Sequence, residues 1–269
     1  MNWIRDLRLF FYFKGQLLKV RRAQDSEPFT NPCRFGNIEF EITPSQDYVM
    51  IWTTFLADLT PEEARDLVEL VGARYPFSAR YEELKSACPN IVFKDGDEWI
   101  FFGGSFNPWH PGHQACLNLA PKEVTTFVIP DRSPHKDLRD IEPVSTLLHL
   151  SSKIRFKKNQ YLVPTFLLTP KKNPTVEWME KLRSDLPEKK LALLVGFDSF
   201  QNILSWTRAP DLLNVLTTLY VVSRMETDLV RKTIAASVKN VAPKIEIVFL
   251  GHHDFETISS TEIRNNPNK

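Results

Sequence analysis

The pattern of apolar and polar residues changes near residue 97. Before that point, NIEFEI at residues 37–42 alternates as a half-exposed strand does, and DYVMIWTTFL at 47–56 predicts a second, mostly apolar strand. A helix is expected after Thr60, with Pro61 at its first position and Glu63 completing a capping box. Residues 1–97 are therefore predicted to form a small α+β module, to which the sequence assigns no role.

From residue 98 onward, short apolar runs alternate with helical patterns. The runs are WIFF, VTTFVIP, YLVPTFLL, LALLVG, TLYVVS and IEIVFL. Continuous apolar strands separated by helices are typical of a parallel sheet that is covered on both faces. Residues 98–269 are therefore predicted to form a doubly wound parallel α/β domain. In such sheets ligands bind beyond the carboxyl ends of the strands, so functional motifs are expected directly after each run.

Composition narrows the class of protein. The 269 residues carry 34 basic and 33 acidic side chains, a balance that points to neither nucleic acid nor a membrane surface as the main partner. The three cysteines, Cys33, Cys88 and Cys116, form no C-x-x-C pair and are expected to be buried thiols in a reducing compartment. The apolar run Leu9–Phe13 is too short for a membrane span and is interpreted as core or interface. A cytoplasmic protein is expected.

The first strand of the α/β half leads into the most informative segment. WIFF is followed by Gly103, Gly104, the string SFNPWHPGH and a helical pattern, an arrangement that points backbone N–H groups at an anion. The string is neither a Walker loop nor G-x-G-x-x-G. His110 and His113, at the mouth of the helix, can donate hydrogen bonds to phosphate oxygens where charge accumulates. Two alternatives remain: a tight turn with incidental histidines, or a metal-binding pair.

Two later segments carry further candidates. VIPDRSPHKD, at residues 128–137, contains His135 and Lys136, which belong either to a solvated loop or to a site where the lysine acts as a point charge. In NPTVEWMEKL, at 173–182, Thr175 precedes an amphipathic pattern, and N-capping of that helix is sufficient to explain it.

The run LLVGFDSFQNILSWTR, at residues 193–208, combines three features. Gly196 ends a strand, and Asp198 is suited to accept hydrogen bonds from ribose hydroxyls, although it could instead N-cap the next helix. Trp206 follows eight residues later and is either part of the core or an aromatic surface for a flat ring.

The last motif is FETISSTEIRNN, at residues 255–266. Ser259, Ser260 and Thr261 supply hydroxyls and free backbone N–H groups at a helix start, and Arg264 follows about one turn later. Together these groups predict a second anion site. A capping box from Ser259 to Glu262 is the alternative explanation for two of these residues.

These motifs resemble those of a known family. GSFNPWHPGH closely resembles the G-x-F-x-P-x-H-x-G-H signature of the adenylyl- and cytidylyltransferase superfamily. SPHK is similar to the P-P-H-K element of bacterial nicotinate-mononucleotide adenylyltransferases, with Ser133 in place of a proline, and GFDS with its following tryptophan and ISSTEIR resemble two further motifs of that family. The likeness begins near Glu98 and implies a Rossmann-like nucleotidyltransferase fold.

The resemblance implies roles for individual residues. The implied catalytic residues are His110, His113, Lys136 and Arg264. The implied ATP-binding residues are Gly104, Ser105, Phe106, Gly112, Gly196, Asp198, Ser259, Ser260 and Thr261, and the implied mononucleotide-binding residues are Thr175, Trp206 and His135.

The reaction implied is the transfer of an adenylyl group from ATP to nicotinate mononucleotide, which gives deamido-NAD and pyrophosphate in NAD biosynthesis. Mg²⁺ is expected to arrive with the ATP phosphates. No metal site in the protein is predicted, since the ring directions of adjacent His252 and His253 diverge and no third ligand is nearby in the sequence. The alternatives are a transferase that uses nicotinamide mononucleotide, phosphopantetheine or CTP, and a nucleotide-sensing regulator. Residues 1–97 are expected to pack on the transferase half or to form a homo-oligomer.

Overall fold

The computed structural model describes residues 9–13, 16–22, 33–35, 38–44, 97–131, 146, 149–150, 153–157, 160–163 and 174–265. The chain divides into two compact units. One contains Met1–Lys94, Ile141–Ser152 and Val163–Leu168, and the other contains Asp95–Asp140, Lys153–Leu162 and Thr169–Lys269.

The described strands of the first unit form an antiparallel sheet. The strands are β1 (Leu9–Phe13), β2 (Gln16–Arg22), β3 (Cys33–Phe35) and β4 (Ile38–Pro44), in the order β1-β2-β4-β3. The strand predicted at residues 37–42 is confirmed as β4, and the run interpreted as core or interface forms β1. The strand predicted at 47–56 and the helix predicted after Thr60 lie outside the described residues.

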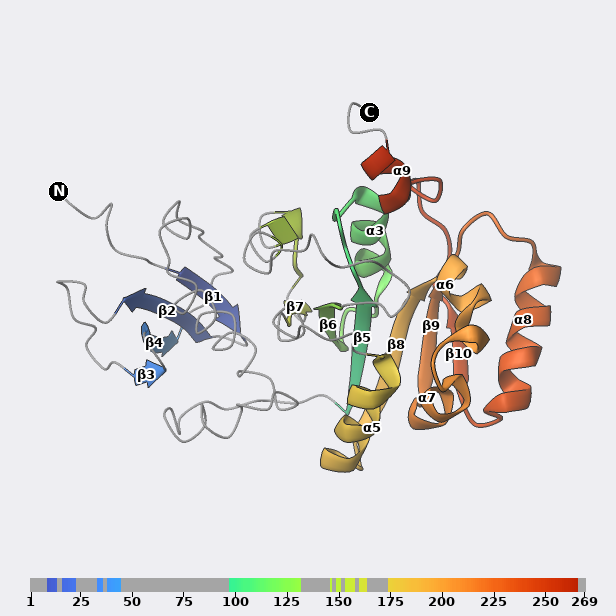
Figure 1. The fold of residues 1–269 in the computed structure, drawn as a ribbon, viewed down its shortest axis with the longest axis horizontal. Coiled ribbons are helices and arrows are strands. Elements are labelled where there is room, and N and C mark those ends of the chain that lie inside the picture. Colours follow the sequence, from blue (N-terminus) through green and yellow to red (C-terminus); the bar gives the residue numbers. More distant parts are fainter. Residues whose placement is uncertain are drawn as a thin grey trace. The chain divides into compact units, whose positions relative to one another are not determined.

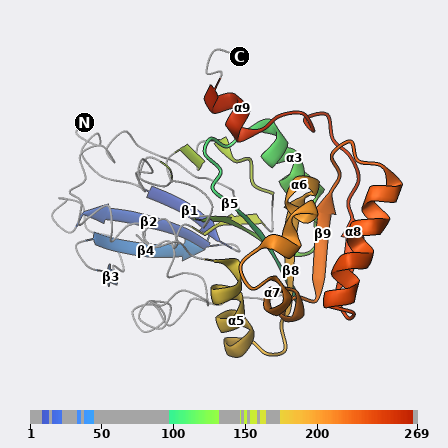
Figure 2. The same ribbon diagram turned by 45° about the vertical axis from the view of Figure 1, so that its right-hand side comes forward.

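The second unit is built on a six-stranded parallel sheet (Figures 1 and 2). The strands are β5 (Glu98–Gly104), β6 (Thr125–Pro130), β7 (Gln160–Leu162), β8 (Lys190–Gly196), β9 (Thr218–Val222) and β10 (Glu246–Phe249). Each of the six apolar runs overlaps one of these strands, so the prediction of a parallel sheet is confirmed. The spatial order β7-β6-β5-β8-β9-β10 reverses direction between β5 and β8, as in a doubly wound Rossmann-like sheet.

Helices connect the strands and cover the sheet. They are α3 (Pro111–Leu119), α5 (Thr175–Asp185), α6 (Phe197–Gln201), the 3-10 helix η4 (Ile203–Ser205), α7 (Ala209–Val215), α8 (Asp228–Val241) and α9 (Ser260–Asn265). Right-handed crossovers, the rule for parallel strands, place α3 on one face and α5, α7 and α8 on the other. Helix α5 packs against α7, and α7 against α8. Within the described residues, no helix combines the length and the apolar character that a membrane crossing requires.

Buried aromatic side chains hold the middle of this sheet. Phe101 of β5 stacks on Phe127 of β6 with ring centroids 5.5 Å apart, and Trp178 of α5 meets Phe101 edge-on at 5.3 Å. Trp99 packs against Phe127 at 5.2 Å. Burying each such ring contributes about 1.5–3 kcal/mol, and close packing leaves little room for movement. The carboxyl end of β5 is therefore a fixed base for the loop that follows it.

Candidate functional site

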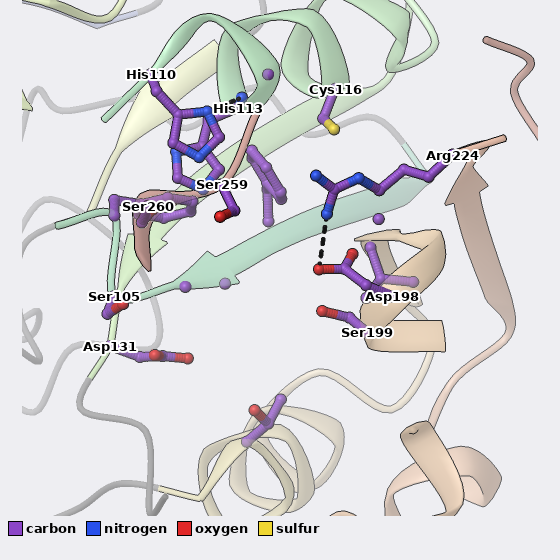
Figure 3. A pocket seen from close by; sticks show the side chains of 18 of the residues that line it. Ser105, His110, His113, Cys116, Asp131, Asp198, Ser199, Arg224, Ser259 and Ser260 are labelled. Atoms are coloured by element: carbon purple, nitrogen blue, oxygen red, sulfur yellow. Dashed lines mark hydrogen bonds and ion pairs between the residues drawn. The ribbon is translucent and has the colours of Figure 1, made fainter. Parts of the chain in front are cut away.

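A cavity of about 380 Å³ opens at the carboxyl ends of β5 and β8, where the strand order reverses (Figure 3). Twelve of the predicted site residues line it. They are Gly104, Ser105, Phe106, His110, Gly112, His113, Thr175, Gly196, Asp198, Trp206, Ser259 and Ser260. Motifs separated by up to about 150 positions in the sequence thus meet at one place. His135 and Lys136 lie outside the described residues, as does the side chain of Thr261.

Two glycines allow the loop after β5 to pack tightly. A Cβ atom on Gly104 would lie 2.9 Å from Cε1 of Phe106, closer than real Cβ contacts. A Cβ atom on Gly112 would lie 3.1 Å from the ring of His110 and 3.3 Å from the carbonyl oxygen of Phe255. Phe106 has a φ of 43°, a strained conformation for a residue with a large side chain. The glycines therefore let the two histidines approach their neighbours closely.

Three aromatic rings surround His113. The centroids of Phe106, Trp109 and Phe102 lie 5.1, 5.3 and 6.4 Å from the centroid of its imidazole, and all three rings are buried. These rings come from β5 and from the loop that follows it. The phenylalanine and tryptophan of SFNPWHPGH thus restrict the orientation of the second histidine by packing.

His110 is the N-cap of α3. Its Nδ1 accepts a hydrogen bond from the backbone N–H of His113 at 3.4 Å, so Nε2 carries the proton of the neutral ring. Burial is the main cause that lowers the pKa of His110 to about 4, and the nearby Arg224 guanidinium lowers it further. The two imidazoles stack with centroids 3.6 Å apart. At neutral pH His110 is therefore an uncharged hydrogen-bond donor.

Asp198 reaches the cavity from the first turn of α6. The N-cap of α6 is Gly196, without a side-chain capping bond, so the alternative that Asp198 caps this helix is wrong. Its Oδ2 instead pairs with Nη1 of Arg224 at 3.0 Å, and 62% of the side chain is exposed (Figure 3). A Cβ atom on Gly196 would lie 2.8 Å from Oδ1 of Asp198, so the carboxylate needs this glycine in order to keep its position.

Thr175 and Trp206 lie on a different part of the cavity lining. Helix α5 begins at Thr175 itself, and its N-cap is Pro174, so the N-capping explanation for Thr175 is wrong. Trp206 follows η4 and is half-buried, which places it on the cavity lining rather than in the buried core. Arg208 has a φ of 51° and contacts both carboxylate oxygens of Glu180 in α5, at 2.5 and 3.0 Å. This ion pair joins the turn that carries Trp206 to α5.

The C-terminal segment closes the cavity on the side of the loop after β5. Ser260 Oγ donates a hydrogen bond to the carbonyl oxygen of Pro108 at 3.3 Å, and Arg264 donates to the carbonyl oxygen of Asn107. Ser259 and Ser260 line the cavity, whereas Arg264 lies beside the loop. The capping box predicted from Ser259 to Glu262 involves a side chain outside the described part of the structure.

Several lining residues escaped the sequence prediction. Arg224 lies two residues after β9, and Asp131 is the first residue after β6. Both positions directly follow an apolar run. The expectation that functional residues lie directly after each run could therefore have identified them. Cys116 also lines the cavity, and burial raises the pKa of its thiol to about 12, which confirms the predicted buried thiol. His253 lies beside it, with Nε2 3.9 Å from Sγ of Cys116.

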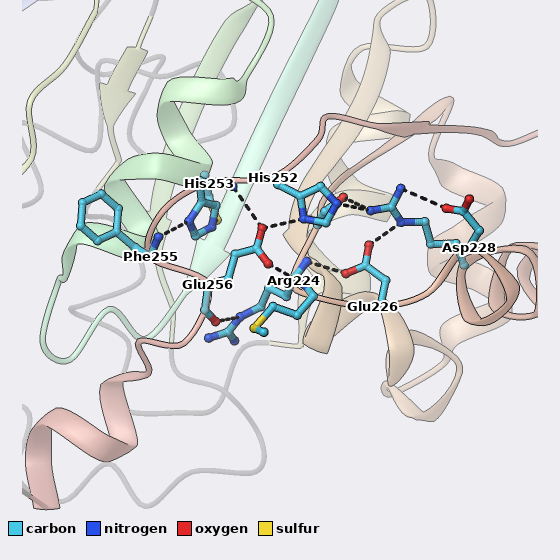
Figure 4. Close-up of polar contacts among 11 residues, drawn as sticks. Arg224, Glu226, Asp228, His252, His253, Phe255 and Glu256 are labelled. Atoms are coloured by element: carbon cyan, nitrogen blue, oxygen red, sulfur yellow. Dashed lines mark hydrogen bonds and ion pairs between the residues drawn. The ribbon is translucent and has the colours of Figure 1, made fainter.

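The polar groups around His252 pair with one another. Nδ1 of His252 contacts Glu256 Oε1 at 2.7 Å, and Nε2 contacts Arg231 at 2.9 Å (Figure 4). Nδ1 of the neighbouring His253 accepts a hydrogen bond from the backbone N–H of Phe255 at 3.0 Å. Among the residues that the structure describes, no group of three or more His, Cys, Asp or Glu is arranged to hold a metal ion.

Comparison with known proteins gives related sequences. The probable nicotinate-nucleotide adenylyltransferase of Leptospira borgpetersenii serovar Hardjo-bovis (strain JB197) is 29% identical over 130 residues, which are 46% of this chain and 66% of that protein. The chain thus spans just under two thirds of the length of this relative. A protein of the same name from Caldicellulosiruptor bescii is 27% identical over 169 residues, which are 61% of this chain and 83% of that protein.

Two further comparisons concern a solved structure and a family. The Plasmodium falciparum nicotinic acid mononucleotide adenylyltransferase complexed with NaAD aligns with a TM-score of 0.49 and 21% identity, over 63% of this chain and 83% of that chain. Residues 101–266 match the family model described as Cytidylyltransferase-like. Because this match covers more than half of the sequence, the chain belongs to the Cytidylyltransferase-like family.

Proposed function

We propose that the chain is a nicotinate-nucleotide adenylyltransferase, which uses ATP and nicotinate mononucleotide to form deamido-NAD and pyrophosphate. One observation carries the proposal: eight of the nine residues expected to bind ATP and two of those expected to bind the mononucleotide line the same cavity. The names of the two related proteins, both probable nicotinate-nucleotide adenylyltransferases, support the choice of the acceptor.

The reaction needs alignment and charge neutralisation. An oxygen of the mononucleotide 5′-phosphate forms a bond to the α-phosphorus of ATP, and the bond from that phosphorus to the oxygen leading to the β-phosphorus breaks. Pyrophosphate leaves with that bonding pair. The attacking phosphate is already ionised at neutral pH, so no general base is required. Positioning and electrostatic stabilisation therefore account for the catalysis.

The histidines supply donors to the triphosphate in this proposal. His110 is neutral with its proton on Nε2, so it can donate a hydrogen bond from that atom. His113 is held in place by the rings that surround it, so a hydrogen bond that it donates needs no movement of the side chain during the reaction. Lys136 and Arg264 add positive charge, together with the Mg²⁺ that accompanies ATP. Ser259, Ser260 and Thr261 are proposed to bind the β- and γ-phosphates.

The opposite side of the cavity is proposed to hold the sugar and the acceptor. Asp198, with one oxygen on Arg224, has its second oxygen available to a ribose hydroxyl. Trp206 presents a half-buried indole to the cavity, which suits stacking on a flat, electron-poor pyridine ring. Thr175 and His135 are assigned to the same acceptor, the former as a hydroxyl at the start of α5.

Initial rates of pyrophosphate release test the proposal. The full chain is assayed with Mg·ATP and, separately, with nicotinate mononucleotide, nicotinamide mononucleotide and phosphopantetheine, and each acceptor is repeated with CTP. Nicotinate mononucleotide with ATP is expected to give the highest kcat/KM. A higher value with another pair would identify a related transferase instead. Tight ATP binding without pyrophosphate release from any acceptor would identify a nucleotide sensor.

A further inference from the structure

Arg224 makes three hydrogen bonds that connect distant parts of the cavity lining. Nη1 donates to Asp198 Oδ2 at 3.0 Å (Figure 3), and Nε donates to the carbonyl oxygen of Glu256 at 2.8 Å (Figure 4). Nη2 donates to the carbonyl oxygen of Ile258 at 2.8 Å. The side chain is 24% exposed and lines the cavity from the end of β9. All three nitrogens of the guanidinium are thus engaged.

The partners of Arg224 belong to two elements that are far apart in the sequence. Asp198 lies in α6, directly after β8, whereas Glu256 and Ile258 lie between β10 and α9. Ile258 immediately precedes Ser259 and Ser260, which line the cavity. Arg224 therefore fixes the separation between a carboxylate and a pair of serines that face the same space.

Polar contacts also hold the backbone at the base of Arg224. The N–H of Arg224 donates to Glu226 Oε2 at 2.5 Å, and the N–H of Met225 donates to Glu256 Oε2 at 2.5 Å. Oε1 of Glu256 contacts His252 Nδ1 at 2.7 Å (Figure 4). The turn after β9 and the segment after β10 thus bind each other through backbone groups as well as through the guanidinium.

The planar guanidinium suits this arrangement in a way that an ammonium group does not. Its five N–H groups leave in fixed directions, so one side chain can serve a carboxylate on one side and two carbonyl groups on the other. A lysine carries the same charge, but as a single point that cannot span three separated acceptors. The geometry therefore requires arginine specifically and not merely positive charge.

We propose that Arg224 is a positioning residue for a nucleoside triphosphate: it holds Asp198 and the Ser259–Ser260 segment at the separation between the ribose and the phosphates of one bound nucleotide. The identification of that nucleotide as ATP rests on the proposed function. The larger effect is expected on the nucleotide, because the side chain of Arg224 donates to Asp198, Glu256 and Ile258 and, within the described residues, makes no hydrogen bond to Thr175 or Trp206.

The experiment measures the Kd of Mg·ATP by calorimetry in the absence of acceptor, for the wild-type full chain and for Arg224→Ala and Arg224→Lys. Arg224→Ala removes all three hydrogen bonds that hold the two parts of the nucleotide site, so it is expected to weaken ATP binding about tenfold or more. Arg224→Lys is expected to recover only part of this loss. In the transfer assay, the KM for ATP should rise while the KM for the mononucleotide changes by less than about twofold, the small change expected where no contact is lost.

Arg183→Ala is the matched control. Arg183 is a half-buried arginine whose guanidinium also donates to backbone carbonyl groups, those of Pro187, Lys189 and Val215. It does not line the cavity, and these acceptors are not the partners of Arg224. Arg183→Ala should leave the Kd of Mg·ATP unchanged. An equal loss of affinity in Arg183→Ala, or wild-type affinity in Arg224→Ala, overturns the inference.

Two further variants keep the test decisive if Arg224→Ala fails to fold. Asp198→Asn, alone and combined with Arg224→Lys, should show non-additive losses of ATP affinity, because both changes disrupt one contact. Strictly additive losses would contradict the inference. Because the readout is ATP binding without acceptor, a failure of transfer in the acceptor panel contradicts the proposed function alone, whereas equal ATP affinities contradict this inference alone.

Discussion

The two walls of the cavity are built in different ways. The histidine wall, residues 103–113, consists largely of buried rings: Phe106, Trp109 and His110 are each less than 8% exposed. The Asp198 wall, residues 196–206, relies on ion pairs that water reaches, since Asp198 is 62% exposed and the nearby Arg208 is 49% exposed. Close packing fixes atoms strongly, whereas exposed pairs contribute little and weaken in salt. Substitutions in the histidine wall should therefore lower stability and activity more than substitutions in the Asp198 wall.

The largest effect is expected for His113. His113→Ala should lower kcat by about a hundredfold or more, because the proposed function makes His113 a donor to the charge that develops during transfer. His113→Phe should lose a similar amount of activity while keeping its thermal midpoint, since a ring of similar size remains among Phe102, Phe106 and Trp109. Pyrophosphate release and thermal unfolding measure the two properties. A wild-type rate in His113→Phe would remove His113 from the mechanism.

Gly104→Ala is expected to reduce both stability and rate. The new methyl group would lie 2.9 Å from the packed ring of Phe106, and overpacking of this kind costs about 1–3 kcal/mol of unfolding free energy. A displaced Phe106 would also release His113, so kcat should fall. Gly251→Ala is the control: its φ of 91° makes alanine strained, but no atom lies within 4 Å. It should lose stability and keep kcat. A fall in stability without a fall in kcat for Gly104→Ala would argue against the packing model.

Gly196→Ala applies the same change to the Asp198 wall. The methyl group would lie 2.8 Å from Oδ1 of Asp198, but this carboxylate is exposed and can rotate away. We expect the KM for ATP to rise severalfold, the loss of about one hydrogen bond, with little change in the thermal midpoint. An equal loss of stability in Gly196→Ala and Gly104→Ala would contradict the view that close packing holds the histidine wall and exposed ion pairs hold the Asp198 wall.

The titration of His110 tests the buried character of the histidine wall. Because its pKa falls from 6.5 to about 4 in the folded chain, the unfolded chain binds a proton at a higher pH than the folded one. This group should therefore decrease the free energy of unfolding as the pH falls from about 6.5 to about 4, and it should have no effect above that window. NMR of the imidazole should show no titration near pH 6.5. In His110→Asn, which keeps an N-cap, this part of the pH dependence should disappear.

The smallest effect is expected for Glu180→Gln. The ion pair with Arg208 is solvent-exposed on both sides, so its loss should leave the thermal midpoint and the KM for the mononucleotide close to wild type. Unfolding scans and acceptor titrations at low and at high salt measure this. A large rise in the KM would show that the pair holds Trp206 more firmly than exposed pairs usually do.

The sequence predicted the sheet because the physical signal is local. Each strand of the parallel sheet overlaps a short apolar run, which is typical of strands covered on both faces, and such a run can be recognised without knowledge of distant residues. The glycines and histidines of the first loop were predicted for the same reason, since they follow one strand within eleven positions. Local patterns also misled: the hydroxyl of Thr175 suggested an N-cap, but the helix begins at that residue and Pro174 occupies the capping position.

Arg224 could not be assigned from local pattern alone. Its partners, Asp198 and the carbonyl groups of Glu256 and Ile258, lie 26 to 34 positions away, and nothing in VVSRMET indicates three acceptors. Similarly, the packing of Phe106 and Trp109 around His113 depends on how the loop folds back on itself. These are tertiary contacts, and only the arrangement of the chain in space brings them into view.

The bond from Ser260 to Pro108 joins residues 152 positions apart. During synthesis, the loop with His110 and His113 leaves the ribosome long before Ser259 and Ser260 do. A nascent chain can fold β5 and α3 early, but its cavity lacks one side until the segment after β10 has emerged. The order of translation thus delays completion of the cavity until the segment after β10 has been made, so that a polypeptide stalled before Ser259 would lack one side of the proposed phosphate site.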